Sequence, residues 1–183
     1  MAKKNVRRMV LDAAIDLVAS SGSAQITLDA VALRAGVSKG GLQHHFKSKS
    51  ALLTEMVAHV ISLFLEDLQK AAGEDHDVVE GGIPLALYME RAFSGQGARV
   101  PTAKVIFAVY AYDPALLRPL REFFKQRNKG LLKAHGKQLG HALIMMMIAD
   151  GVWIFDALGA SPLTAAERKI ALAAALKIVE RPI

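Results

Sequence analysis

Apolar positions recur along most of the chain every three or four residues, which is the spacing of one face of a helix. The first such face consists of Val6, Met9, Val10, Ala13, Ala14, Leu17 and Val18. It ends at Ser20-Ser21-Gly22, where a glycine can adopt the left-handed conformation that follows a helix. No window alternates strictly between apolar and polar residues, so no sheet is expected. The pattern predicts an all-α protein.

Capping residues and breaks divide the rest of the chain into further helices. Thr27 and Ser38 can cap two short helices, and Ser48 can cap a long one that runs to about Ala72. Thr164-Ala165-Ala166-Glu167 has the reciprocal capping pattern and opens the last helix. The other helices are expected at 84–94, 102–112, 114–137 and 140–158, and the last one at 164–179.

The two short helices within residues 28–46 predict a helix-turn-helix, because a turn of about three residues joins them. Gly36 lies where the chain reverses, and Leu42 packs back onto the first of the two helices. The exposed side of the second helix then carries short or polar side chains. These are Ser38, Lys39, Gly40, Gln43 and His44. Such side chains suit contact with a DNA groove and its phosphates.

Two adjacent glycines, Gly40-Gly41, are unusual inside a helix, where each costs about 1 kcal/mol relative to alanine. One interpretation is that the missing side chains let the backbone approach DNA closely. The other is a frayed first turn, in which helix propensity matters little. We favour the close approach because the pair lies in a helix-turn-helix.

The positive charge is concentrated in the first quarter of the chain. Residues 1–50 hold eight Lys/Arg and three acidic residues, so they carry +5 of the formal net charge of +6. This distribution favours a head that binds a polyanion on an electrically neutral body. A solvated basic face without a partner is the alternative.

Three segments resemble the N-terminal signature of the TetR family of bacterial regulators: 27–32, 35–40, and 45–49 with Leu52-Leu53. The resemblance implies an all-helical homodimer that binds a double-stranded DNA operator. It implies an N-terminal three-helix DNA-binding domain at 1–47 and a C-terminal domain at 48–183 for ligand binding and dimerisation.

The resemblance also assigns roles to single residues. Thr27 and Lys49 correspond to phosphate contacts at helix starts, and His45 to a contact with the DNA backbone. Gln43 can pair bidentately with adenine, and Lys39 can reach guanine or phosphate.

A ligand pocket is expected among the middle helices, which carry more aromatic and methionine side chains than a dimer bundle needs. The expected lining is Met89, Phe93, Phe107, Tyr110, Met146 and Trp153, with Asp150 and Tyr110 as polar anchors. Each of these apolar side chains can equally serve the core. For Asp150 we favour an internal hydrogen bond over contact with a cationic or hydroxylated ligand.

The helices at 140–158 and 164–179 are expected to pair with their twins as a four-helix bundle. The reason is the width of the last apolar surface, which exceeds one narrow stripe. Its members are Ala171, Leu172, Ala174, Ala175, Leu176 and Ile178.

Other classes of function find no support in the sequence. The chain has no cysteine, no phosphate-binding loop, no dinucleotide fingerprint and no nucleophile elbow, so no enzyme, cofactor or metal site is expected. Asp150 and Asp156 interrupt the most apolar stretch and argue against a membrane span, and Asp12 and Asp16 interrupt the only leader-like start. A cytoplasmic protein is expected.

The sequence thus predicts a ligand-responsive regulator, a repressor that a small apolar molecule releases from a palindromic operator. The alternative is a dimeric DNA-binding regulator with no small-molecule ligand.

Overall fold

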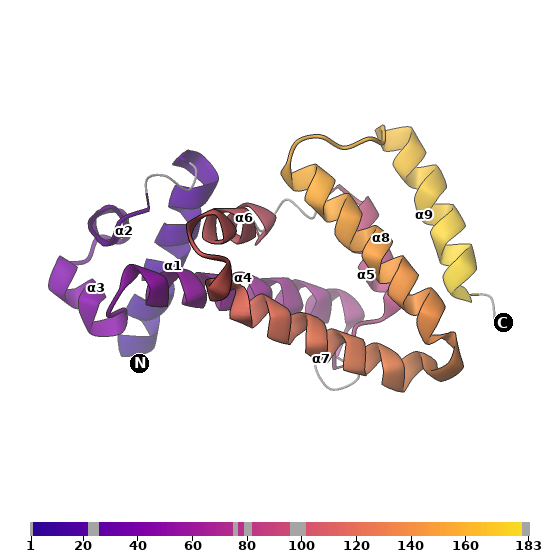
Figure 1. Ribbon diagram of the computed structural model, residues 1–183, viewed down its shortest axis with the longest axis horizontal. Helices are drawn as coiled ribbons and strands as arrows, with labels where there is room; N and C mark the ends of the chain where they lie inside the picture. Colours follow the sequence, from indigo (N-terminus) through magenta and orange to yellow (C-terminus); the bar gives the residue numbers. More distant parts are fainter. Residues whose placement is uncertain (1, 22–25, 75–76, 79–81, 96–101, 181–183) are drawn as a thin grey trace. The chain divides into compact units, whose positions relative to one another are not determined.

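A computed structural model describes the chain except for residues 1, 22–25, 75–76, 79–81, 96–101 and 181–183. Within the described residues every regular element is helical, as the sequence predicts (Figure 1). The α-helices are α1 (Ala2–Ser21), α2 (Leu28–Ala35), α3 (Lys39–His45), α4 (Lys49–Ala72), α5 (Leu85–Phe93), α6 (Thr102–Tyr112), α7 (Arg118–His135), α8 (Leu139–Ala157) and α9 (Ala165–Glu180).

Most helix ends lie within a residue or two of the expected positions, but the helix expected at 114–137 is divided. It consists of a 3-10 turn, Pro114–Leu117, then α7, then a second 3-10 turn, Gly136–Gln138. The Asp113 carboxylate accepts a hydrogen bond from the backbone N–H of Ala115 (2.8 Å) and so fixes the first turn. The expected break at Gly22 lies outside the described residues.

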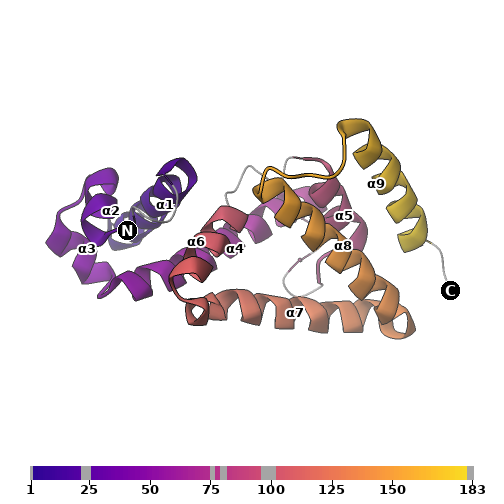
Figure 2. The ribbon, with the colours of Figure 1, turned by 45° about the horizontal axis from the view of Figure 1, so that its top comes forward.

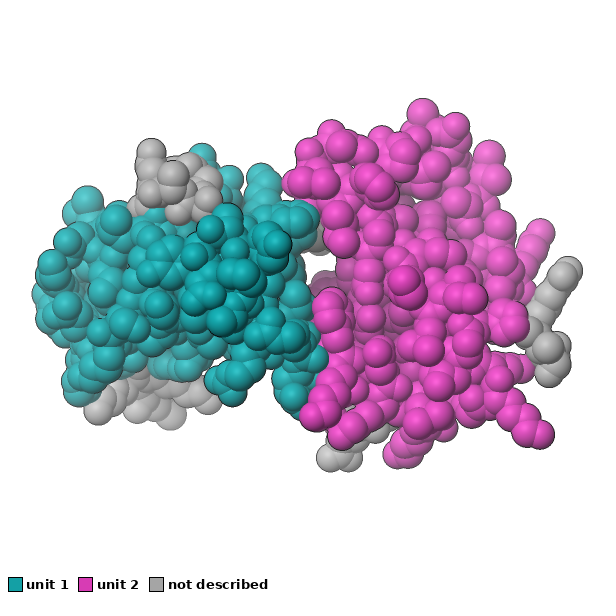
Figure 3. Space-filling model, in the orientation of Figure 1, with its two compact units in different colours: residues 1–62, 101–122 teal, residues 63–100, 123–183 magenta. Residues whose placement is uncertain are grey.

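Contacts divide the chain into two compact units (Figure 3). Unit 1 contains residues 1–62 and 101–122, and unit 2 contains residues 63–100 and 123–183. Helices α4 and α7 each contribute residues to both units. The expected boundary after residue 47 separates a DNA-binding domain from a ligand-binding and dimerisation domain. It is a division by function, which the contacts do not test, and it stays a prediction.

The core of unit 1 forms where α1 meets α2, α3 and α6. The expected face of α1 is only partly right, because Met9 is 44% exposed whereas Leu11 and Ile15 are buried. The buried stripe is wider than one face because α1 packs against several helices at once. Leu42 and Phe46 are buried in this unit, as expected for the helix-turn-helix.

The core of unit 2 forms around α5, which packs against both α8 and α9 (Figures 1 and 2). Its most buried large side chains come from α4, α5 and α8. They are Leu68, Tyr88, Met89, Met145 and Met146.

The start of α9 has the reciprocal cap that the sequence predicts. The backbone N–H of Thr164 donates to the Glu167 carboxylate (2.8 Å), and the backbone N–H of Glu167 donates to Thr164 Oγ1 (3.3 Å). Hydrogen bonds from the backbone and hydroxyl of Thr164 lower the pKa of Glu167 below its usual value. The cap therefore stabilises α9 when Glu167 is ionised.

This cap predicts a pH-dependent loss of stability. Thr164→Ala should lower the free energy of unfolding by about 1 kcal/mol, as measured by urea denaturation at neutral pH.

The folded-state pKa of Glu167 is depressed. The contribution of Glu167 to stability is therefore present above the ordinary glutamate pKa and is lost as the pH falls through the depressed value. Glu167→Gln should remove that part of the acid dependence; an unchanged dependence would contradict the role of the cap.

Candidate functional site

Helix α2, the first helix of the helix-turn-helix, is capped at both ends. Gly36 ends α2 in the left-handed conformation (φ 66°), and the backbone N–H of Val37 donates to the carbonyl of Ala32 (3.0 Å). Thr27 Oγ1 accepts a hydrogen bond from the backbone N–H of Ala30 (3.1 Å), which caps the start of α2. The Thr27 hydroxyl therefore already has a structural role besides its expected phosphate contact.

Helix α3 buries one side and exposes the other, as a helix that reads a groove requires. Leu42 is fully buried, and Ser38 caps the helix by accepting a hydrogen bond from the backbone N–H of Gly41 (3.1 Å). His45 is half-buried at the end of the helix. The remaining expected groove residues are exposed together: Ser38, Lys39, Gly40, Gln43 and His44. The structure thus brings the sequence-derived set onto one helix.

The two glycines of α3 have different surroundings. A Cβ added to Gly41 would lie 3.2 Å from the capping Ser38 Oγ, a close contact that a shift of a few tenths of an ångström relieves. A Cβ added to Gly40 would meet nothing within 4 Å. Packing within the chain therefore leaves room for a side chain at Gly40 and constrains Gly41 only through this one contact.

The two lysines of the expected interface are engaged within unit 1. Lys39 forms an ion pair with Asp29 (2.9 Å), and both side chains are more than half exposed. Lys49 lies over the ring of Tyr112, with its Nζ 4.6 Å from the ring centroid. Exposed pairs of this kind contribute about 0–1 kcal/mol to stability. Either lysine can therefore exchange its present partner for a DNA phosphate at little cost in free energy.

Side chains that the sequence interpretation missed hold the first half of α4 against α1. Arg7 forms an ion pair with Glu55 (2.7 Å) and lies over the ring of Phe46. His59 Nε2 lies 2.8 Å from Asp12 Oδ1. Their partners are about 48 residues away in sequence, so helical periodicity carries no signal for these pairs. They join α4 to α1 at positions six and ten residues after Lys49.

Unit 2 contains a second polar group of residues, centred on Asp150. The Asp150 carboxylate accepts hydrogen bonds from the Tyr88 hydroxyl (2.6 Å) and from the Arg127 guanidinium (2.9 Å). Arg127 also donates to the Tyr88 hydroxyl (2.7 Å). The Arg127 side chain is only 7% exposed. The internal hydrogen bond that we favoured for Asp150 is therefore present, with Tyr88 and with an arginine that the sequence interpretation did not identify.

The environment keeps these groups in defined ionisation states. Burial raises the pKa of Tyr88 well above its ordinary value, and the neighbouring Asp150 carboxylate raises it further, so the hydroxyl stays neutral. Burial alone would lower the pKa of Arg127, but its hydrogen bonds and charge interactions with Asp150 and Tyr88 together outweigh burial, and the pKa is raised. Arg127 and Asp150 form an ion pair whose side chains are 7% and 24% exposed.

Aromatic rings surround this triad of Tyr88, Arg127 and Asp150. Tyr88 contacts Trp153 edge-on (4.7 Å between ring centroids), and the guanidinium of Arg127 lies 4.7 Å from the ring centroid of Phe124. Phe64 of α4 contacts Trp153 at 4.8 Å. Two buried donors have no hydrogen-bond partner, Arg127 Nε and Trp153 Nε1.

The structure separates the expected ligand residues into the two units. Five of them belong to unit 2, where Met89, Phe93 and Met146 are buried in the core and Asp150 and Trp153 are half-buried. The other two, Phe107 and Tyr110, belong to unit 1 and are 38% and 59% exposed. The shared pocket therefore stays a prediction.

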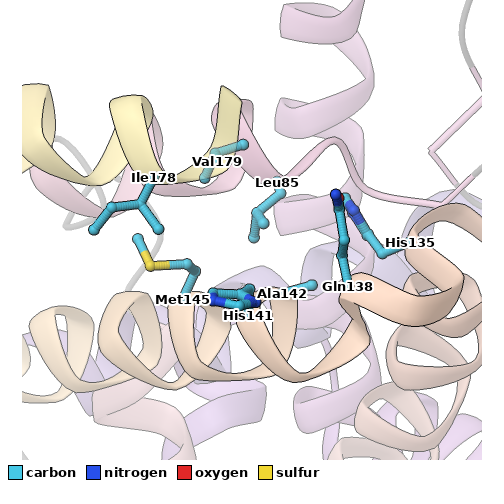
Figure 4. A pocket seen from close by; sticks show the side chains of 8 residues that line it. All are labelled: Leu85, His135, Gln138, His141, Ala142, Met145, Ile178 and Val179. Atoms are coloured by element: carbon cyan, nitrogen blue, oxygen red, sulfur yellow. The ribbon is translucent and has the colours of Figure 1, made fainter. Parts of the chain in front are cut away.

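A small pocket with a cavity volume of about 20 Å³, room for about one water molecule, lies elsewhere in unit 2 (Figure 4). Its lining comes from α5, α8, α9 and the turn after α7. The residues are Leu85, His135, Gln138, His141, Ala142, Met145, Ile178 and Val179. None of the expected ligand residues is among them.

Two protein-family profiles match the chain. Residues 10–56 match the profile described as bacterial regulatory proteins of the tetR family. Residues 82–180, more than half of the chain, match the tetracyclin repressor-like C-terminal domain.

Individual relatives agree over nearly the whole length. The HTH-type transcriptional regulator BetI of Brucella anthropi is 28% identical over 167 residues, which cover 87% of this chain and 86% of BetI. The structure of the SCO7518 protein from Streptomyces coelicolor A3(2) superimposes with a TM-score of 0.70 at 21% identity, covering 96% of this chain and 99% of that one. The transcriptional regulator FadR from Bacillus subtilis, solved in complex with stearoyl-CoA, gives 0.68 at 17% identity, covering 96% and 98%.

The helix-turn-helix with its exposed α3, the all-helical fold and the two profiles lead to the same conclusion. This chain belongs to the TetR family of bacterial transcriptional regulators and is a DNA-binding regulator.

Proposed function

We propose that the chain is a dimeric repressor that a small, largely apolar molecule releases from a palindromic operator. It acts in the cytoplasm, where its DNA is, and as a regulator rather than an enzyme. One observation carries the DNA-binding part of this proposal: the expected groove residues of α3 are exposed together, while Leu42 on the same helix is buried and Ser38 caps the helix.

In this proposal α3 enters the major groove of the operator. Gln43 and Lys39 read base edges, and Gly40 lets the backbone approach the DNA. Thr27 and Lys49 bind phosphates on either side of the groove. Ser38, His44 and His45 complete the contact surface. Support comes from the open space around Gly40 and from the exposure of Lys39, Gln43 and His44.

The second copy pairs through α8 and α9. On α8 the residues at three- and four-residue spacings that face away from the core are apolar and exposed. They are Ile144 (58% exposed), Met147 (72%), Ile148 (44%), Ile154 (46%), Phe155 (46%) and Leu158 (59%). Gly151 lies within this stripe and has nothing within 4 Å of an added Cβ, so another helix can approach closely there.

The same stripe explains why one helical run resembles a membrane span. The run Pro114–Ala157 is long and apolar enough to cross a membrane, yet only 22% of its apolar window is buried within the chain. The run carries both partners of the Arg127–Asp150 ion pair, and its Asp156 pairs with Arg168 of α9. A charged pair fits a partner helix in water better than it fits lipid, so we assign the exposed stripe to the dimer.

The effector binds in unit 2 beside Trp153 and Asp150, and α4 transmits the effect. Phe64 of α4 contacts Trp153 in unit 2, and the same helix begins with Lys49 in unit 1. A shift of Phe64 along or about the helix axis moves the first turn of α4, because the helix is continuous from Lys49 to Ala72. FadR, a protein of the same fold, holds stearoyl-CoA, so the fold can accommodate a small molecule.

Replacing Gly40 tests the close approach to DNA. Gly40→Ala should raise the free energy of unfolding by about 0.5–1 kcal/mol, because alanine is the better helix former and the site is open. The same change should weaken operator binding about tenfold, measured by fluorescence anisotropy. Gly41→Ala is the matched control, because it makes the same helix-favouring exchange at the neighbouring position of α3. Unchanged operator affinity in Gly40→Ala would reject the close approach.

Charging the exposed stripe of α8 tests the dimer. Met147→Glu places two like charges across a two-fold seam, so sedimentation at micromolar concentration should change from dimer to monomer. The matched control is Leu33→Glu, because Leu33 is also exposed (85%) but lies on α2. A wild-type monomer, or a dimer that survives Met147→Glu, would count against this seam.

Operator selection from a random pool of duplex DNA tests the function as a whole. We expect two inverted half-sites, and Gln43→Ala should cost about 1–3 kcal/mol of binding if Gln43 reads a base. Log affinity should fall steeply with log salt. Compounds that change Trp153 fluorescence should release the selected operator. Binding of equal strength to all sequences would refute the DNA part, and failure of every bound compound to release DNA would favour the ligand-free regulator.

A further inference from the structure

In the described part of unit 2, the buried side-chain polar atoms that lack a hydrogen-bond partner are donors. Among the described residues, the buried polar side-chain atoms without a partner are Arg127 Nε and Trp153 Nε1, and both are N–H groups. Among the same residues, no buried side-chain acceptor lacks a hydrogen-bond partner. A buried donor without a partner costs about 1–3 kcal/mol, so an acceptor brought by a ligand gains more here than elsewhere.

The two donors belong to one cluster rather than to separate places. Arg127 donates to the Tyr88 hydroxyl, and its guanidinium carbon lies 5.4 Å from the centroid of the Tyr88 ring. Trp153 contacts the same ring at 4.7 Å between centroids. Trp153 also follows Asp150 by three residues on α8, which places both on one face of that helix. Both donor side chains therefore contact Tyr88.

The charge of the cluster is already balanced. The Arg127 cation is paired with the Asp150 anion, and Tyr88 stays neutral because burial raises the pKa of its hydroxyl. A charged ligand would add one uncompensated charge to a buried site, which is costly. A neutral ligand oxygen adds none.

We infer that the effector site at Arg127 and Trp153 takes a neutral, largely apolar molecule that carries a carbonyl-type oxygen, as in a ketone, ester or amide. The oxygen accepts from Arg127 Nε or Trp153 Nε1, and the apolar body packs on the rings of Phe64, Tyr88 and Phe123. This inference rests on the proposed effector site and names the chemistry that it selects.

The same geometry argues against two other classes of ligand. Asp150 Oδ1 already accepts from Tyr88 and from the Arg127 cation, so the charge of Asp150 is balanced within the cluster and a second cation would not be. The aromatic faces near the two N–H groups are weaker acceptors than a carbonyl oxygen, so they do not remove the preference for one.

Four probes of similar size separate the classes. Acetophenone carries a neutral carbonyl, ethylbenzene has the same skeleton without oxygen, benzoate is an anion and benzylammonium is a cation. Each is titrated into the full-length ¹⁵N-labelled protein. Trp153 is the only tryptophan, so a single indole N–H signal reports on it. The Arg127 Nε–H signal is identified by its loss in Arg127→Lys.

We expect acetophenone to shift both N–H signals and to bind at least tenfold more tightly than each of the other three probes. Trp153→Phe, which keeps a ring but loses the N–H, should reduce the preference for acetophenone over ethylbenzene to about twofold, measured by calorimetry. Arg127→Lys should do the same where it folds. The matched control is Arg168→Lys, because Arg168 is also paired with an aspartate, Asp156, but has no unpartnered buried atom. That control should keep the full preference.

Equal binding of acetophenone and ethylbenzene with unmoved N–H signals would overturn the inference, because water or ring faces would then satisfy the donors. Tighter binding of benzoate or benzylammonium, or no binding of any probe at millimolar concentration, would also overturn it. Operator release distinguishes the two proposals. A compound without a carbonyl oxygen that releases the operator would leave the proposed function standing and remove this inference alone.

Discussion

The triad of Tyr88, Arg127 and Asp150 is the constraint on which the organisation of unit 2 depends, because it joins α5, α7 and α8 through three mutual hydrogen bonds. Removing Asp150 would leave the Arg127 charge, whose side chain is only 7% exposed, without its partner, which is destabilising. The triad therefore holds three helices in one arrangement. The price of that arrangement is two N–H groups, on Arg127 and Trp153, that the chain itself does not satisfy.

In the proposed account those two N–H groups belong to the effector site. Trp153 contacts Phe64 of α4, and α4 carries Lys49 in its first turn, where the Ser48 hydroxyl caps the helix by accepting a hydrogen bond from the backbone N–H of Ala51. Arg7 and His59 fasten this half of α4 to α1 within unit 1. In the proposed account a ligand that repacks the rings around Trp153 changes the position of α4, and the DNA contacts at the start of that helix change with it.

The sequence predicted local features well, because their causes are local. Thr27, Ser38 and the Thr164–Glu167 pair cap the helices that their spacing indicates, and Gly36 adopts the left-handed turn expected of it. The exposed face of α3 followed from one buried leucine in a short helix.

The features that the sequence did not reveal involve distant partners. Arg127 lies 23 residues before Asp150, in a helix rich in basic residues, and helical periodicity does not distinguish it from its exposed neighbours. A signal did exist: Phe123 and Phe124 precede it by four and three residues, the spacing at which a cation and a ring meet on a helix. Phe107 and Tyr110 were grouped with Trp153 by residue type alone, and residue type carries no information about which unit a helix joins.

The central claim is that the effector in unit 2 and the operator at α3 bind to different forms of one protein. Coupling of this kind is reciprocal. Bound operator must therefore lower the affinity for the effector by the same factor by which bound effector lowers the affinity for the operator. The direct measurement is the dissociation constant of an effector from Trp153 fluorescence, with and without saturating operator DNA. The account predicts that operator DNA raises this constant by the same factor, about 10²-fold for a release of that size. An identical constant in both titrations would contradict it.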